Sequence, residues 1–221
     1  MSTIDAPYGV HVHDPHKLGR HVADDAAGRV ESGPASKRII TAYGFWIFLL
    51  SDIVMFSALF ATYAVLKDAT AGGPTGAELF NLTNVGFETA FLLLSSFACG
   101  LAMIAASTRN MAWTQIGLLV TGVLGAAFLA LEVREFADMI TNGAGPQRSA
   151  FLSAFFTLVG CHGLHVTLGL LWLGTMMAQI FTKGFRPNIV RRLLCFSLFW
   201  HALDIIWVAL FTIVYLMGAT Q

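Results

Sequence analysis

Five ionisable side chains lie deep inside long apolar segments of this chain: Asp52, His162, His165, His201 and Asp204. A charged residue at the centre of a membrane helix costs about 2.5–3.5 kcal/mol on insertion scales, so it is rarely without a role. His162 and His165 are one helical turn apart, as are His201 and Asp204, so each pair shares one face of a helix. Asp52 and Asp204 are predicted to lie at similar depth near the membrane midplane.

Three kinds of chemistry fit these residues. The imidazoles could ligate a metal ion or a haem, and carboxyls with imidazoles could relay protons or ions. Alternatively, the His162, His165, His201 and Asp204 side chains satisfy one another between two helices, as buried polar groups must. The spacing favours this structural interpretation over the relay, and the relay over the metal site, because the HxxH pair lacks a third and fourth ligand of certain position.

Other catalytic patterns are absent from the sequence. We find no nucleophile–base pair, no GxGxxG loop and no GxxxxGKS or GxxxxGKT loop. Cys99, Cys161 and Cys195 are far apart in apolar runs and are expected to be small buried hydrophobic residues. These patterns therefore predict no nucleophilic or nucleotide-binding site in this chain, and the metal site stays the least favoured interpretation of the histidines.

A second group of acids, Glu88, Glu132, Glu135 and Asp138, falls near the outer ends of two apolar segments. Water and lipid headgroups lower the cost of a charge at this depth. Arg134 and Arg148 are close enough in sequence to neutralise some of these acids. The sequence therefore predicts an outer rim of interfacial ion pairs.

The composition explains why so few charges stand out. The chain has 221 residues, of which 56% are hydrophobic and 12% charged, with a formal net charge of zero. Soluble domains carry charge on about a quarter of their residues. A nucleic-acid-binding protein needs a basic face, and a disordered chain has little hydrophobicity, so both classes are excluded. The chain is predicted to be a membrane protein.

The elements that position these residues are transmembrane helices, each needing about 20 apolar residues. An all-α, polytopic bundle of five spans is predicted, with spans at about 41–66, 84–106, 114–133, 150–181 and 193–217. Gly and Pro in TAGGPTG (70–76) and NGAGPQ (142–147) predict tight connections. Small residues repeat every four positions at Gly117, Thr121 and Gly125, and at Ala98, Ala102 and Ala106, which favours close helix contacts.

The basic residues predict the orientation of this membrane domain, residues 41–221. Ten of the 13 Lys and Arg residues fall on one side, and three, Lys67, Arg134 and Arg148, on the other. The N-terminus is therefore predicted to be inside and the C-terminus outside. Residues 1–40 form a polar cytoplasmic tail containing His11, His13, His16 and His21, which we interpret as a solvated segment rather than a metal site.

Four stretches together resemble subunit III of the haem–copper respiratory oxidases. They are GFWIFLLSDIVMFSALFATYAVL (44–66), ETAFLLLSS (88–96), GCHGLHVTLG (160–169) and FWHALDIIWVALF (199–211). The combination of HGLH with WHxxDxxW one span later is specific to that family. The five spans, the TAGGPTG turn, NGAGPQRSAFLSAFF (142–156) and the His-rich tail are most similar to the cytochrome bo-type ubiquinol oxidase branch.

The resemblance implies a multi-pass subunit of the bacterial inner membrane in a complex that oxidises ubiquinol, reduces dioxygen to water and pumps protons. Haem and copper would belong to subunit I, which this subunit would stabilise, and this chain itself would have no catalytic, cofactor-binding or metal-binding residue. Its other contacts would be further oxidase subunits and membrane phospholipids, and no nucleic acid. Asp52, Glu135, His162, His165, His201 and Asp204 match family positions, none implied to be catalytic. Asp52 departs from the family, which often has Glu there, so it is a weaker candidate for carboxyl-specific reactivity, while a part in the proton supply of subunit I stays open.

Three other functions remain open from the sequence. The chain could be subunit III of a cytochrome c oxidase, which shares the same family motifs. A membrane-anchored di-haem cytochrome would use His162, His165 and His201 on facing helices. An independent proton-coupled carrier would use Asp52 and Asp204 at the midplane.

Overall fold

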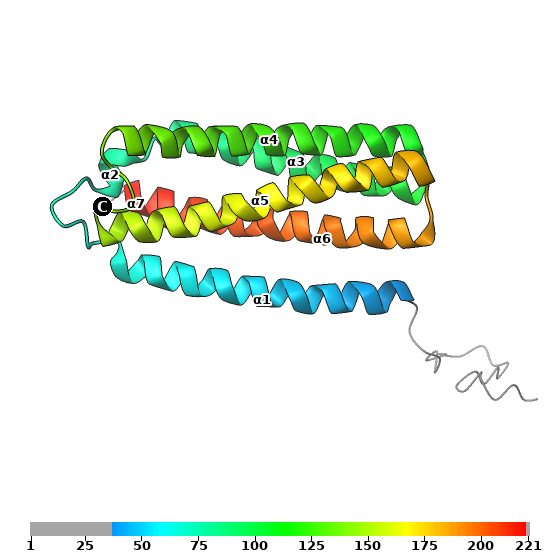
Figure 1. The fold of residues 1–221 in the computed structure, drawn as a ribbon, viewed down its shortest axis with the longest axis horizontal. Coiled ribbons are helices and arrows are strands. Elements are labelled where there is room, and N and C mark those ends of the chain that lie inside the picture. Colours follow the sequence, from blue (N-terminus) through cyan, green and yellow to red (C-terminus); the bar gives the residue numbers. More distant parts are fainter. Residues whose placement is uncertain (1–36, 220–221) are drawn as a thin grey trace, which may run out of the picture. The chain divides into compact units, whose positions relative to one another are not determined.

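The computed structural model describes residues 37–219, and all its regular structure is helical. The long helices are α1 (Lys37–Leu66), α3 (Leu82–Ser107), α4 (Met111–Thr141), α5 (Ala150–Lys183) and α6 (Pro187–Leu210). A π-helical segment, η1 (Phe211–Leu216), continues α6, and the short helices α2 (Gly76–Leu79) and α7 (Met217–Ala219) lie at the same end of the bundle (Figure 1). Five helices are long and apolar enough to cross a membrane. The predicted all-α architecture with five spans is confirmed.

The helix ends differ from the predicted spans where charged residues continue a helix. The third span was expected to end at residue 133, but α4 runs on to Thr141 and includes Arg134, Glu135 and Asp138. The fifth was expected from residue 193, but its helix begins at Pro187, in the first turn, where proline is well tolerated. Hydropathy marks the hydrocarbon core, whereas backbone hydrogen bonding continues through the headgroup region.

Local signals in the connections fix where the helices begin and end. Asn81 caps α3 by accepting hydrogen bonds from the backbone N–H groups of Thr83 and Asn84, and Ser149 caps α5 through the N–H of Leu152. The expected tight connections contain Gly72 and Gly143 at positive φ, 70° and 78°, where glycine has no steric penalty. The expected His-containing tail lies outside the described residues, apart from Lys37–Ile40 at the start of α1.

Helices α3 and α4 lie side by side in close contact (Figure 1). A Cβ added to Gly117 of α4 would lie 2.8 Å from the Cβ of Ala102 and 3.1 Å from its Cα. Both residues belong to the predicted small-residue repeats, which therefore mark a real helix contact. Such close approach gives the dispersion contacts on which helix association in lipid depends.

Trp200 of α6 joins four helices at the centre of the bundle. It is 1% exposed, and its indole N–H donates a 2.9 Å hydrogen bond to the Ser95 hydroxyl of α3. A Cβ on Gly125 of α4 would meet the indole at 2.8 Å, and one on Gly169 of α5 would meet it at 3.0 Å. The indole therefore fills space that two glycines leave open.

Two further contacts between α3 and α6 accompany the one made by Trp200. The Trp207 indole N–H donates to the Thr89 hydroxyl at 3.1 Å, and Ser96 Oγ lies 2.6 Å from His201 Nδ1. We call these three contacts the α3–α6 polar seam. Trp200 and Trp207 thus pack against a neighbouring helix.

Helix α1 has the smallest share of its surface buried within the chain. Only 11% of its most hydrophobic stretch is buried, against 56% of the corresponding stretch in the span formed by α6 and η1. Aromatic residues of α1 contact the other helices. Phe45 lies near Trp172, and Phe56 lies near His162 and His165. The Tyr63 hydroxyl donates a hydrogen bond to the Val214 carbonyl at 3.5 Å. Most of α1 therefore faces away from the other four long helices.

We expect Gly125→Ala to destabilise the bundle by about 1–3 kcal/mol, the usual cost of overpacking. The added methyl group would collide with the Trp200 indole. Because α5 lies against the same indole at Gly169, the ring has little room to move. Gly100→Ala in α3 is the control, because nothing lies within 4 Å of its Cβ position and alanine is the better helix former. Unfolding of the purified protein in mixed micelles would measure both, and equal stability of the two variants would contradict the role of Gly125.

Candidate functional site

His201 and Asp204 lie on α6 but face α3 rather than α5. His201 Nδ1 contacts the Ser96 hydroxyl, and Asp204 interacts electrostatically with His201 and with the same hydroxyl. One Asp204 oxygen, Oδ1, is buried without a hydrogen-bond partner. Both side chains line a shallow groove of about 390 Å³ whose other walls, such as Leu93 and Phe97, are mostly apolar.

The two histidines of the HGLH motif have different surroundings. His165 Nδ1 contacts the Cys161 carbonyl of its own helix at 2.7 Å. His162 is fully buried, and neither ring nitrogen has a hydrogen-bond partner. Its ring instead packs against aromatic rings of three other helices, with centroids 5.2 Å from Trp207, 5.9 Å from Phe128 and 6.3 Å from Phe56.

These positions correct the expectation that the residues satisfy one another. His162, His165 and Asp204 do not share hydrogen bonds, and His201 finds its partner on α3. Ser96 of α3 contacts both His201 and Asp204, and the neighbouring hydroxyls of Ser95 and Thr89 contact the α6 indoles. The sequence did contain that signal, because Thr89, Ser95 and Ser96 fall inside an otherwise apolar run, but hydroxyl residues are common in membrane helices and did not stand out.

Asp52 lies apart from Asp204, on α1. Its side chain is half-buried and interacts electrostatically with the Cys161 thiol of α5. The two carboxyl groups therefore have separate surroundings, Asp52 facing Cys161 of α5 and Asp204 facing Ser96 of α3.

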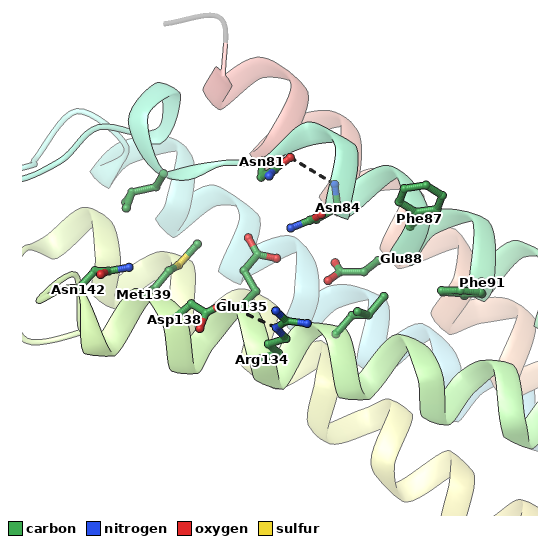
Figure 2. Close-up of a pocket in the computed structure, with 12 residues that line it drawn as sticks. Asn81, Asn84, Phe87, Glu88, Phe91, Arg134, Glu135, Asp138, Met139 and Asn142 are labelled. Atoms are coloured by element: carbon green, nitrogen blue, oxygen red, sulfur yellow. Dashed lines mark hydrogen bonds and ion pairs between the residues drawn. The ribbon is translucent and has the colours of Figure 1, made fainter.

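The second group of acids encloses a pocket of about 530 Å³ between α3 and α4, which we call the acidic pocket. Figure 2 shows Glu88 of α3 and Glu135 of α4 directing their carboxyl groups into the space between the two helices. Glu88 is 1% exposed and Glu132, behind them, is 3% exposed. The three glutamates interact electrostatically with one another.

Only one member of this group forms the expected ion pair. Arg134 Nε lies 3.9 Å from Asp138 Oδ2, and both side chains are largely exposed. Arg148 packs instead near Gly73, in the connection before α2. Within residues 37–219 no salt bridge reaches Glu88, Glu132 or Glu135, so the predicted outer rim is in part a set of buried, unpaired carboxyl groups.

Glycine also determines the position of Glu132. A Cβ on Gly163 of α5 would lie 2.6 Å from Glu132 Oε1, so only glycine lets this carboxyl group rest against the α5 backbone. Gly163, the glycine of the HGLH motif, therefore has a packing role that the motif alone did not reveal.

Among the described residues, no group of three or more His, Cys, Asp and Glu side chains is arranged to hold a metal ion. Cys99, Cys161 and Cys195 are free thiols. What the arrangement does is join helices through buried hydroxyl, indole and imidazole groups, and leave carboxyl groups unpaired in one pocket.

Comparison with known proteins gives consistent results. Residues 19–219 match the family model described as cytochrome c oxidase subunit III. Subunit 3 of the cytochrome bo(3) ubiquinol oxidase of Pseudomonas aeruginosa is 49% identical over 99% of this chain and 100% of its own length. The subunit of the same name from Pseudomonas putida is 51% identical over 81% of this chain and 86% of its own length. Cytochrome c oxidase subunit 3 of Bacillus sp. strain PS3 is 43% identical over 79% and 84%.

We expect Ser96→Ala to lower the free energy of unfolding by about 0.6–2 kcal/mol, the range for interhelical hydrogen bonds in membranes. The substitution removes the partner of His201 and a polar neighbour of Asp204. Ser107→Ala is the control, because the Ser107 hydroxyl is exposed and donates only to the Ile104 carbonyl of its own helix. If the two variants melt alike in detergent, the Ser96–His201 contact does not hold α3 and α6 together.

Proposed function

This chain belongs to the cytochrome c oxidase subunit III family, and we propose that it is the third subunit of a bo-type ubiquinol oxidase. In that complex, ubiquinol is oxidised, dioxygen is reduced to water and protons are pumped. Near-full-length similarity to the Pseudomonas aeruginosa ubiquinol oxidase subunit, at 49% identity, is the observation that carries the proposal. The 43% identity to a cytochrome c oxidase subunit 3 makes the other branch the alternative.

The chain acts in this proposal without a redox centre of its own. Haem and copper belong to subunit I, the main contact, and further oxidase subunits and phospholipids cover other surfaces. The N-terminus lies in the cytoplasm and the five spans cross the bacterial inner membrane, an orientation supported by the distribution of Lys and Arg. The chemistry of the buried side chains agrees, since they bond helices to one another.

Stabilisation of subunit I is the proposed role, and the exposure of apolar helix faces supports it. Helix α1 buries only 11% of its most hydrophobic stretch within the chain, and large side chains such as Val54 and Val65 are 69% and 80% exposed. In a membrane these faces meet lipid tails or another subunit. A rigid bundle with an open apolar face is suited to supporting a neighbouring membrane protein.

A tagged copy of the chain, isolated from its native membrane in mild detergent, is expected to bring down an oxidase with the spectrum of b- and o-type haems. That oxidase should consume oxygen with ubiquinol and not with reduced cytochrome c. Oxygen uptake supported by cytochrome c would favour the alternative branch. Isolation without any haem protein, or a haem bound to this chain alone, would contradict the proposal.

We propose in addition that Asp52 assists proton supply to the complex. Asp52→Asn removes the charge at nearly constant size and is expected to shorten the time for which the oxidase sustains turnover. Asp52→Glu is the control, because it keeps a carboxyl group at the position. The measurement is the decay of oxygen uptake at saturating ubiquinol, compared with assembly measured by haem content. Equal decay of both variants and the unchanged protein would exclude the role.

A further inference from the structure

The acidic pocket contains carboxyl groups that the rest of the chain does not satisfy. Glu88 Oε2, Glu132 Oε2 and both oxygens of Glu135 are buried and have no hydrogen-bond partner. A buried acceptor without a partner carries the full cost of its desolvation, about 1–3 kcal/mol and more for a charged group. Three such side chains close together, with no basic partner among residues 37–219, indicate that a cationic hydrogen-bond donor completes the site.

The pocket does not fit a bare metal ion. Its carboxyl groups are not arranged as metal ligands within the described residues, and its volume of about 530 Å³ is far larger than one ion needs. A primary ammonium group fits better, because it has one positive charge and three N–H donors that can bond to several carboxylate oxygens at once. The space around the carboxyl groups leaves room for the atoms that carry the ammonium group.

The walls of the pocket indicate what those atoms are. The lining includes Arg134 and the side-chain amides of Asn81, Asn84 and Asn142, which are suited to phosphate oxygens. Apolar side chains complete it, among them Phe91 and Leu131, each about one helical turn deeper than the nearest of the two lining glutamates. Carboxyl groups, polar groups suited to phosphate and apolar side chains thus line one pocket.

The depth of the pocket matches the boundary of the bilayer. Glu88 is six residues after Leu82, where α3 begins, a distance of about 9 Å along the helix. The 26 residues of α3 extend about 39 Å, longer than the hydrocarbon core of about 30 Å. The end of α3 therefore lies among headgroups, and Glu88 lies close below them.

We propose that the acidic pocket binds the primary ammonium group of an aminophospholipid headgroup, with Glu88 and Glu135 as its direct partners. Glu132 lies behind them, against Gly163. Arg134 contacts the lipid phosphate. The inference does not depend on the proposed oxidase function, because every residue that carries it belongs to this chain.

The test compares two lipids that differ only at the headgroup nitrogen, which has three N–H hydrogen-bond donors in one lipid and three methyl groups in the other. The chain, purified with whatever subunits accompany it, is placed in nanodiscs of phosphatidylglycerol with added phosphatidylethanolamine or phosphatidylcholine. Native mass spectrometry then measures retained lipid, and the melting temperature of the chain is followed in parallel. Phosphatidylethanolamine should bind saturably and at least about tenfold more tightly than phosphatidylcholine, whose quaternary nitrogen cannot donate. Equal retention of the two lipids would overturn the proposal.

Variants then locate the binding in the pocket. Glu88→Gln and Glu135→Gln should each weaken phosphatidylethanolamine retention about tenfold, while Asp68→Asn, an exposed acid outside the pocket, should leave it unchanged. In discs without phosphatidylethanolamine, Glu135→Gln should melt at a higher temperature than the unchanged protein, because repulsion among the carboxyl groups is relieved. This sign distinguishes loss of the ligand from loss of the fold. Unchanged retention by both glutamine variants would overturn the proposal.

A soluble amine is the competing source of the same ammonium group. Free ethanolamine is therefore added to discs that contain phosphatidylethanolamine. The proposal expects little competition, because the phosphate and acyl contacts are missing from the free amine. Full displacement at a concentration equal to that of the lipid headgroup would overturn the lipid as the ligand.

Discussion

The fold depends on the hydrogen bonds that α6 indoles donate to α3 hydroxyls. Thr89 and Ser95 each have one O–H donor and two acceptor lone pairs. Their O–H groups bond within α3, to the Val85 carbonyl at 2.8 Å and the Leu92 carbonyl at 3.0 Å, and their lone pairs accept from Trp207 and Trp200. Each hydroxyl thus donates one bond and accepts one without competition between the two, since an indole N–H can only donate.

The glycines of α4 and α5 make this arrangement sterically possible. Trp200 is the largest kind of side chain, and it reaches Ser95 only because Gly125 and Gly169 leave room for the ring. In lipid the apolar surface of one helix gains little from meeting another, so packing and hydrogen bonds must supply the association energy. Here the same indole supplies both. The bundle is therefore sensitive to small changes at its centre and tolerant along its exposed faces.

Much of the fold could be predicted from the sequence, because hydropathy alone sets the number of spans. That Ala102 and Gly117 lie on contacting helix faces was also predictable, since small residues at intervals of four mark such a face, but the repeats do not say which helix each one meets. The site was less predictable. Which helices His162 and His201 face depends on rotation about each helix axis, which a sequence pattern does not determine. The unpaired state of Glu88 and Glu135 depends on the partners that the nearby arginines take, since Arg134 pairs with Asp138 and Arg148 packs near Gly73.

The α3–α6 polar seam also has a consequence for biosynthesis. A chain made from its N-terminus delivers α3 to the membrane well before α6, the last span. During that interval an unsatisfied hydroxyl in lipid would be costly. Thr89 and Ser95 avoid the cost because each already donates to a carbonyl of its own helix. When α6 arrives, its indoles find acceptors already oriented, so the last helix to be inserted completes the bundle without disturbing the earlier ones.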